Sequence, residues 1–242
     1  MSQKRASADR TTYDQAYVRS LFDRIAPQYD FLNHLLSSGL DVLWRKRAIR
    51  TLRDYHPKRI LDVATGTADL AIEAASLRPE KIVGVDISTE MIRRAEGKIA
   101  RRGLQGLIEL EPGSAEELRF SDGSFDAVMV GFGIRNFANL EKGLAQLHRV
   151  LRSAGVLMIL EFSRPHRTPL KQAYGFYFHR ILPLVGGLIS RSREAYDYLP
   201  RTVAQFPDGE ELLALLASIG YVRPRQQPLS GGIATIYTGL KP

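Results

Sequence analysis

Two carboxylates follow apolar runs of the sequence at the spacing expected where strands of a nucleotide-binding sheet end. Asp62 comes after the apolar residues 60–61, just before a turn that contains Gly66. Asp86 ends a second apolar run, twenty residues after Gly66. In open α/β sheets a glycine turn approaches the ligand, and an acid about 20 residues further on binds ribose hydroxyls. The spacing therefore predicts a ribose-containing ligand held by Gly66 and Asp86, with Asp62 beside the turn.

The residues around this turn favour a cationic ligand over a dinucleotide. A dinucleotide site needs three glycines in the pattern G-x-G-x-x-G, because the pyrophosphate packs against bare backbone at a helix N-terminus. Here Gly66 alone fits, with Ala64 and Ala68 on either side. Asp62 and Asp69 place two negative charges beside the turn, which would oppose a pyrophosphate and attract a cation. S-adenosylmethionine, with its sulfonium and ammonium, is favoured; a nicotinamide or flavin dinucleotide and an unliganded sheet are the alternatives.

Each of these side chains also has a structural interpretation. Asp62 could cap the following turn, and Asp86 could be an ordinary acid at a strand end. Ser114, which follows a third apolar run, could cap a helix together with Glu117. Because the three groups follow three successive strands, and ligands bind outside the carboxyl ends of such sheets, a common binding site is the favoured interpretation.

Alternating strands and helices are expected to position these residues. Continuous apolar runs predict strands over 59–63, 81–86, 107–110, 125–130 and 155–161, as in a parallel sheet covered by helices on both faces. Asp208 and Glu211 form a possible capping box for a further helix. Residues 221–229 and 232–240 are expected to close the sheet as a hairpin around Gly231 and Gly232. The predicted fold is α/β, with a seven-stranded, mostly parallel sheet and an antiparallel C-terminal hairpin strand.

Two segments lie outside this strand and helix pattern. Residues 1–58 are predicted to be an N-terminal arm, frayed over 1–16, and a helical cap in which Val18, Leu21, Phe22 and Ile25 repeat at helical spacing. Residues 164–201 are rich in Tyr and Phe and are predicted to be a lid inserted into the sheet domain, which spans 59–242.

These two segments also carry the basic excess of the chain, whose net charge is +8. Residues 1–59 hold 12 Lys and Arg against 6 Asp and Glu, residues 164–201 hold 7 against 2, and the remainder holds 15 against 18. Contact with a polyanion, either anionic lipid or nucleic acid, is one interpretation, and scattered surface charge is the other. The chain has no cysteine and no apolar run near the ~20 residues of a spanning helix, so a cytoplasmic protein is expected.

Longer motifs extend from about Val18 to Lys241. They are residues 22–33 (Phe-Asp-Arg-Ile-Ala-Pro-Gln-Tyr-Asp-Phe-Leu-Asn), 36–39 and 44–45 in the cap, 132–136 (Phe-Gly-Ile-Arg-Asn) after the fourth strand, and 161–165 (Glu-Phe-Ser-Arg-Pro) after the fifth. On these motifs the chain resembles the ubiquinone/menaquinone biosynthesis C-methyltransferases, which include the demethylmenaquinone methyltransferases. The resemblance covers nearly the whole chain.

This resemblance implies a Rossmann-like, class I S-adenosylmethionine-dependent methyltransferase without a metal. It places the methyl donor on Thr67, Asp86, Ser114 and Ala115, with Gly131 lining the pocket. The sequence departs from the family pattern in having Ser114 for Asn, Gly131 for Ser and Ala68 for Gly. The implied reaction is methylation of a ring carbon in a reduced, prenylated quinone. Demethylmenaquinol is the favoured acceptor, with the methoxy-benzoquinol of ubiquinone biosynthesis as a second one.

The implied chemistry requires a quinol hydroxyl, which titrates near pH ~10 as tyrosine does, to lose its proton. Arg135 is the candidate cation that lowers the pKa of this hydroxyl, and a water held by Arg135 and Asn136, or His34, is the candidate base. A structural ion pair is the alternative for Arg135, and a structural cap histidine is the alternative for His34. The residues expected to contact the substrate are Tyr29, Asn33, Phe132, Tyr177 and Tyr196.

The implied partners are a lipophilic quinol and an anionic membrane surface to which the protein attaches peripherally, with a homodimer as a further possibility. Nucleic acid is not expected, because the Asn/Asp-Pro-Pro-aromatic signature of amino-group methyltransferases is absent after the fourth strand. A methyltransferase acting on RNA or on a small molecule, a non-catalytic binding module and an NAD-dependent reductase are the rival functions.

Overall fold

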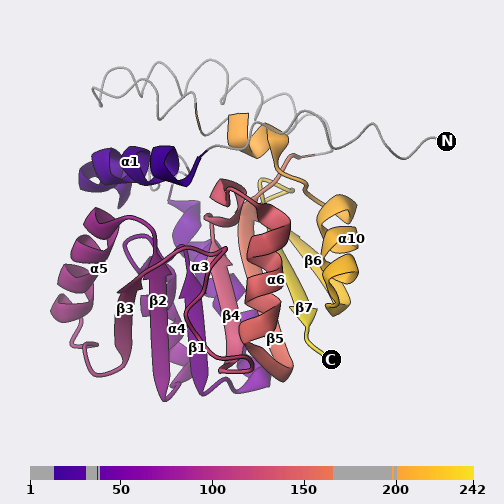
Figure 1. The fold of residues 1–242 in the computed structure, drawn as a ribbon, viewed down its shortest axis with the longest axis horizontal. Helices are drawn as coiled ribbons and strands as arrows, with labels where there is room; N and C mark the ends of the chain where they lie inside the picture. The colour runs from indigo at the N-terminus through magenta and orange to yellow at the C-terminus, as the bar shows by residue number, and fades with distance from the viewer. Residues whose placement is uncertain (1–13, 31–36, 38, 166–197, 199–200) are drawn as a thin grey trace.

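A sheet in the strand order β3-β2-β1-β4-β5-β7-β6 forms the centre of the computed structural model (Figure 1). The structure describes residues 14–30, 37, 39–165, 198 and 201–242. Within them the strands are β1 (Arg59–Val63), β2 (Lys81–Asp86), β3 (Ile108–Pro112), β4 (Phe125–Gly131), β5 (Leu151–Phe162), β6 (Val222–Leu229) and β7 (Ala234–Leu240). Strands β1 to β5 are parallel, and β7 lies antiparallel between β5 and β6. The predicted seven-stranded sheet with its closing hairpin is confirmed.

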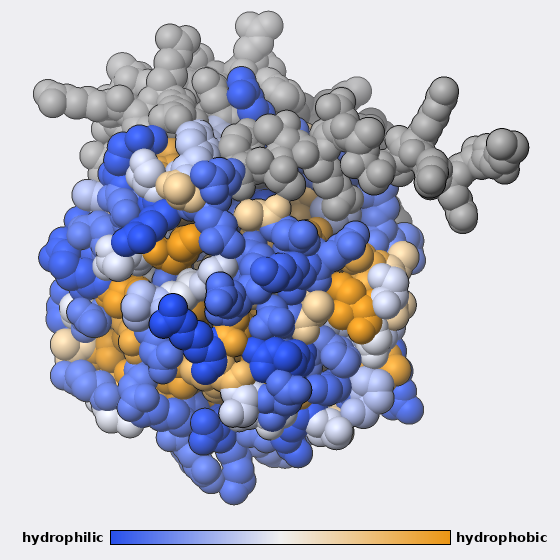
Figure 2. Space-filling model, in the orientation of Figure 1, coloured by the Kyte–Doolittle hydropathy of each residue, from blue (hydrophilic) through white to orange (hydrophobic). Residues whose placement is uncertain are grey.

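Helices cover both faces of this sheet, as the continuous apolar strands predict. One face packs against α3 (Leu40–Thr51), α4 (Asp69–Ala74) and α5 (Thr89–Arg101), and the other against α6 (Leu140–Val150) and α10 (Glu210–Ile219). Short 3-10 turns are η1 (Ala26–Gln28), η2 (Arg53–Tyr55), η3 (Ala75–Leu77) and η4 (Ile134–Asn136). The outer surface over α5 and α6 is mainly hydrophilic, with apolar residues visible over α10 (Figure 2).

The cap helix α1 (Gln15–Ile25) lies across the end of the sheet at which the parallel strands finish (Figure 1). Asp14 accepts a hydrogen bond from the Ala16 amide and caps the helix. Val18 and Leu21 are buried beneath it. The described part of the predicted cap is mainly helical, and helix α1 begins at Gln15, inside the stretch predicted to be frayed.

The predicted capping box at Asp208 is wrong, and the alternative interpretation of Ser114 as a helix cap does not hold. Asp208 does not cap α10, whose first turn follows Gly209 without a side-chain cap. Instead Asp208 accepts hydrogen bonds from the backbone amide of Arg164 at 2.9 Å and from its guanidinium at 2.6 Å. Both carboxylate oxygens of Asp208 accept from Arg164, and the ion pair with its guanidinium competes with a cap on the helix. Ser114 begins no helix; it forms an isolated β-bridge with Glu117.

Strand β5 is longer than predicted, since it begins at Leu151 and not at Gly155. Leu151 pairs with Phe125 and Val156 pairs with Ala127, so the register shifts across residues 152–155. The outer strands carry residues that suit an edge position: Pro224 and Pro228 in β6, and exposed Glu109 and Glu111 in β3. The predicted division at residue 58 stays a prediction, and the greater part of the predicted lid lies outside the described residues.

Candidate functional site

A pocket lies between the cap and the carboxyl ends of the central strands. Its empty space, including the open mouth, is about 620 Å³. The predicted site residues that line it are Tyr29, Gly66, Asp86, Ser114, Ala115, Phe132 and Asn136. The sheet order changes direction between β1 and β4 at this point, which is where ligands bind in open α/β sheets.

The glycine turn after β1 is held in place by Asp86. The Gly66 amide donates a hydrogen bond to Asp86 Oδ2 at 2.8 Å, and the Ser88 amide donates to Oδ1 at 2.9 Å. Ala64 and Ala68 both have positive φ, at 55° and 65°. Such a conformation costs roughly 1–2 kcal/mol in a residue with a Cβ, and it is found mainly where function requires it. The turn is thus a strained loop tied to the strand-end acid.

Burial makes the two strand-end carboxylates weak acids. Asp62 is almost completely buried, and desolvation raises its pKa to about 7, with the charge of Asp86 adding to the effect. Desolvation likewise raises the pKa of Asp86 to about 6. The Thr65 hydroxyl donates to Asp62 Oδ2 at 2.6 Å and opposes the shift in the pKa of Asp62. Two desolvated carboxylates side by side favour a cation as their neighbour.

The loop after β3 meets the start of the cap through a small polar network. The Ser114 hydroxyl donates to Glu116 Oε2 at 2.5 Å, and the Gln15 amide group donates to Ser114 Oγ at 3.0 Å and to Glu116 Oε2 at 3.1 Å. Sequence reasoning missed Gln15 and Glu116 as lining residues. The sequence offers no signal for Gln15 because it precedes the apolar repeat of the cap, whereas Glu116 lies two residues after Ser114 and could have been included.

The Phe-Gly-Ile-Arg-Asn corner after β4 is built around a buried ion pair. Arg135 Nη1 donates to Glu161 Oε1 at 2.6 Å and to the Phe132 carbonyl at 2.5 Å. Both side chains are buried, at 7% and 0% exposure. Burial raises the pKa of Glu161, while the Arg135 charge opposes that shift. Glu161 was missed as a site residue, although an acid directly after the apolar run 156–160 is a recognisable signal.

The corner also packs directly on the glycine turn. A Cβ on Gly133 would lie 2.5 Å from that of Ala64, so only glycine allows this contact. Asn136 lines the pocket, and its Oδ1 accepts a hydrogen bond from the Tyr198 hydroxyl at 2.9 Å. Tyr198 in turn lies 6.2 Å from the Tyr17 ring. Asn136 therefore links the pocket to Tyr198, near the end of the predicted lid segment, and Tyr198 in turn contacts the cap.

Some predicted site residues do not line this pocket. Arg135 and Asp62 lie behind its wall, and the Thr67 hydroxyl donates to Asp30 at 2.5 Å. Gly131 faces α4, where an added Cβ would approach a Leu70 methyl to 2.9 Å. The roles of these four residues stay predictions. Asn33, His34, Tyr177 and Tyr196 lie outside the described residues.

The described residues contain neither a candidate metal-binding cluster nor a helix suited to span a membrane. Within residues 14–30, 37, 39–165, 198 and 201–242, His, Asp and Glu side chains form no group of three or more that could hold a metal ion. In the same part of the chain no helix has the length and apolar character required to cross a bilayer.

Comparison with known sequences gives matches over almost the whole chain. The model of the ubiE/COQ5 methyltransferase family matches residues 10–241. The demethylmenaquinone methyltransferase of Porphyromonas gingivalis is 46% identical over 226 residues, covering 93% of this chain and 92% of that protein. The ubiquinone/menaquinone biosynthesis C-methyltransferase UbiE of Geotalea uraniireducens is 45% identical over 226 residues, covering 93% and 96%.

Comparison with solved structures shows the same fold at low sequence identity. A S-adenosylmethionine-dependent methyltransferase of Thermotoga maritima, described as a possible histamine N-methyltransferase, aligns with a TM-score of 0.63 and 19% identity over 93% of this chain and 100% of that one. Phosphoethanolamine N-methyltransferase 2 of Haemonchus contortus, in complex with S-adenosylmethionine, gives 0.65 and 16% over 93% and 60%. The predicted class I architecture is confirmed by this likeness and by the sheet order.

Proposed function

This chain belongs to the ubiE/COQ5 methyltransferase family, and from that membership we propose that it transfers a methyl group from S-adenosylmethionine to a ring carbon of a reduced, prenylated quinone. The sequence motifs pointed to the same family, and that recognition is confirmed. Demethylmenaquinol is the favoured acceptor, because relatives at 43% and 46% identity are named demethylmenaquinone methyltransferases. The methoxy-benzoquinol of ubiquinone biosynthesis is the second acceptor.

The pocket at the strand ends is the observation that supports a methyl-donor site most strongly. Asp86 presents a carboxylate at the end of β2 that can accept hydrogen bonds from ribose hydroxyls. Gly66, which has no side chain, leaves room for the ligand beside this carboxylate. Ser114 and Ala115 are the proposed contacts for the adenine, and the desolvated Asp62 lies where positive charge is favoured. The bound donor would supply a methyl group on a sulfonium, which makes the methyl electrophilic.

Phe132 and Asn136 are the proposed contacts for the quinol ring on the other side of the pocket. A ring carbon becomes nucleophilic when the adjacent hydroxyl ionises, so a hydrogen-bond donor beside that oxygen assists the reaction. The Asn136 amide lines the pocket and can supply such a donor while Tyr198 holds its oxygen. Arg135 lies behind the wall, where Glu161 offsets its charge, so we propose that it supports the corner and adds a partial positive potential there.

Positioning of the two substrates supplies the rest of the rate. Holding a nucleophile in line with the transferred group can lower a barrier by ~7–11 kcal/mol, provided that water is excluded. The cap covers the pocket from one side, with Val18, Phe22 and Tyr29 along its wall. We propose that the predicted lid, including Tyr177 and Tyr196, completes the enclosure.

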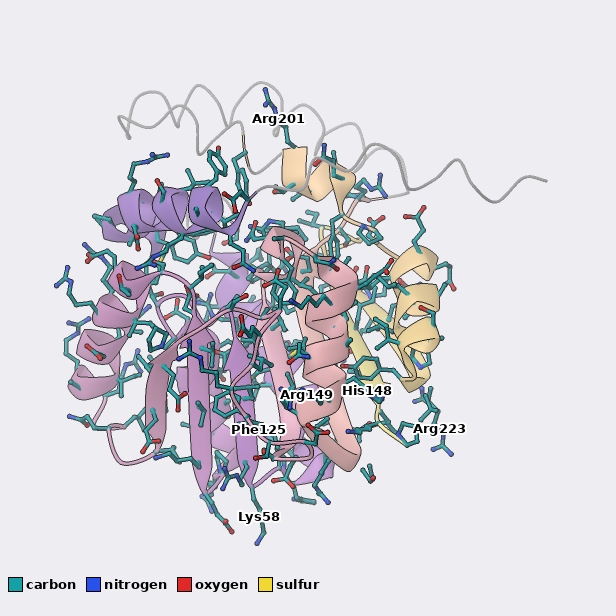
Figure 3. The ribbon with its side chains drawn as sticks, in the orientation of Figure 1. Lys58, Phe125, His148, Arg149, Arg201 and Arg223 are labelled. Atoms are coloured by element: carbon teal, nitrogen blue, oxygen red, sulfur yellow. The ribbon has the colours of Figure 1, made fainter. Side chains whose placement is uncertain are left out.

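We also propose peripheral attachment to anionic membrane at the end of the molecule that carries the cap. Arg19, Arg24 and Arg201 are exposed there, and Arg201 points away from the body at the end opposite Lys58 (Figure 3). A prenylated acceptor must leave lipid to reach the pocket, so attachment beside the pocket entrance shortens that path. Flotation with anionic vesicles should exceed flotation with neutral vesicles and weaken at high salt; equal binding to both would contradict the electrostatic part of this proposal.

The reaction is tested by transfer of a labelled methyl group to each quinol under reducing conditions. Methylation of demethylmenaquinol is expected, and the same assay with the methoxy-benzoquinol decides whether the enzyme uses both rings. The variant Asp86→Ala should bind S-adenosylmethionine much more weakly by calorimetry. Binding of unchanged affinity would remove Asp86 from the ribose site, and absence of transfer to either quinol would refute the proposed reaction.

A further inference from the structure

The cap meets the loops after three successive strands through one polar side chain each. These contacts join Gln15 to Ser114 after β3 at 3.0 Å, Asp23 to Ser88 after β2 at 2.5 Å, and Asp30 to Thr67 after β1 at 2.5 Å. We refer to these three contacts as the clasps. Between them, the side chains of Val18, Phe22 and Tyr29 line the pocket. The clasps therefore fix how the cap covers the pocket.

The clasp at Asp30 differs from the other two because a cation from a third element enters it. Lys98 of α5 donates to Asp30 Oδ2 at 2.9 Å and to Thr67 Oγ at 3.0 Å, and it also forms an ion pair with Asp69 at the start of α4. The Lys98 side chain is only 17% exposed, whereas those of Asp30 and Asp69 are 40% and 28% exposed. Lys98 thus lies between one carboxylate of the cap and one beside the glycine turn.

A chain of alternating charges extends this clasp back into the cap. Asp69 is 3.6 Å from Arg45, and Arg45 is 2.7 Å from the buried Asp41. The Ser37 hydroxyl donates to Asp41 at 2.7 Å. The cap residues on both sides of segment 31–36 are therefore tied to the α4 start. Without Lys98 the carboxylates of Asp30 and Asp69 would lose the cation that they share, and their mutual repulsion would weaken the hold of the cap on the turn.

Tyr29 connects this charge chain to the methyl donor. It directly precedes Asp30, lines the pocket, and has its ring 3.6 Å from the position of a Cβ on Gly66. Its ring also meets Phe22 at 6.0 Å. Lys98 itself does not line the pocket. Lys98 can therefore act on the donor only through its partners, which are Asp30 beside Tyr29 on the cap side and Thr67 and Asp69 on the side of the glycine turn.

We propose that Lys98 is a positioning residue for the methyl donor: it holds the cap closed through Asp30, and separation of the two charges accompanies donor entry and product release. This inference rests on the proposed function, since it needs S-adenosylmethionine in the pocket. The cap in this conformation places Tyr29 over the turn, and movement of the cap would uncover a ligand that lies under Tyr29. The Asp30–Lys98 contact is the most exposed part of the charge chain and is the natural point of opening.

The variant Lys98→Met tests this inference by stopped-flow measurement of S-adenosylmethionine dissociation from the full-length protein. Loss of a partly buried charge cluster should speed dissociation about tenfold and raise the KM for the donor similarly, with kcat at saturating donor not reduced. Lys98→Arg should restore the wild-type rate because it keeps the charge. Arg93→Met, on the same helix in an exposed pair with Glu90, is the matched control and should leave the rate unchanged.

A second variant separates charge balance from general damage to the fold. Adding Asp30→Asn to Lys98→Met removes the charge that repels Asp69 while leaving an amide oxygen for Thr67, so the double variant should hold the donor more tightly than Lys98→Met alone. In the wild type, dissociation should accelerate between ~0.1 M and ~1 M salt, as the Debye length falls from about 10 Å to about 3 Å, and this dependence should be weaker in Lys98→Met.

The outcomes distinguish this inference from the proposed function. If wild-type protein does not bind S-adenosylmethionine, the proposed function fails. If wild type binds it, and dissociation is neither salt-dependent nor changed by Lys98→Met, then Lys98 plays no part in positioning. If Lys98→Met fails to fold, Asp30→Asn alone serves in its place, since it should speed dissociation several-fold without loss of melting temperature. An unchanged rate in that variant would likewise overturn the inference.

Discussion

The variant Asp62→Asn should make the ligand-free protein more stable at alkaline pH. The Asp62 carboxyl is 1% exposed, and burial raises its pKa from the ordinary value of 3.8 to about 7. Because one pKa unit corresponds to about 1.4 kcal/mol, ionising this buried group in the folded protein costs about 4 kcal/mol of folding free energy. The amide of asparagine has nearly the same shape, can still accept the Thr65 hydrogen bond, and has no charge to bury.

The pH dependence gives this prediction its sign. The folded-state pKa is higher than the unfolded one, so the folded protein holds an extra proton between 3.8 and about 7. The contribution of Asp62 to stability therefore falls as pH rises through this window, and the full cost is present above pH ~7. The advantage of Asp62→Asn over wild type should grow by up to about 1.4 kcal/mol per pH unit and then level off. Any change in unfolding free energy that comes from the amide group itself is the same at every pH, so it does not affect this trend.

Urea unfolding of wild type and variant between pH ~4 and pH ~9, without ligand, measures this difference directly. Asp54→Asn, at an exposed position of η2, controls for the loss of one carboxylate. A difference between Asp62→Asn and wild type that does not change with pH would refute the reasoning, because it would mean that Asp62 ionises as easily in the folded protein as in the unfolded chain. The same variant should bind S-adenosylmethionine more weakly. This result would show that the Asp62 carboxylate lowers the stability of the protein and raises its affinity for the ligand.

Three further substitutions test the corner after β4. Arg135→Met should lower the free energy of unfolding in urea by ~3–5 kcal/mol, because it leaves buried Glu161 without its partner. Adding Glu161→Gln should restore much of that loss. Recovered turnover in the double variant would show that Arg135 is structural. Gly133→Ala should lower the melting temperature by the equivalent of ~1–3 kcal/mol and weaken donor binding, since its Cβ would meet Ala64 at 2.5 Å; wild-type stability and affinity would contradict the close packing. Tyr198→Phe should raise the KM for quinol with a stability loss of only ~1 kcal/mol, and an unchanged KM would separate the Asn136 hydrogen bond from substrate binding.

Local sequence pattern predicts the parts of this fold that depend on burial. The runs ending in Asp62 and Asp86 are strands because continuous apolar residues require cover on both faces, and both acids come to the same edge because the strands are parallel. Ser88 comes directly before α5 and is of a residue type that favours the helix N-cap; its hydroxyl accepts a hydrogen bond from the Met91 amide. Where one local rule determines the outcome, sequence reasoning succeeds.

Local sequence rules do not predict the contacts between segments that lie far apart in the chain. Asp208 fits a capping box locally, yet it binds Arg164, which lies 44 residues away. Arg135 appears free to act on a substrate when the sequence is considered alone, but Glu161 reaches it from the neighbouring strand. The packing of whole helices and strands determines which partner a charged side chain meets. The periodicity of a single segment carries no information about that packing. The ties of the cap to Ser114, Ser88 and Thr67 belong to the same class.

The outer strands of the sheet limit how two copies of this protein could associate. Pro224 and Pro228 lack the amide hydrogens that a new neighbour of β6 would need, and β3 carries the exposed charges of Glu109, which pairs with Lys81, and of Glu111. Both features disfavour the addition of a strand from a second copy at either outer edge of the sheet. The same features oppose edge-to-edge aggregation of newly made chains.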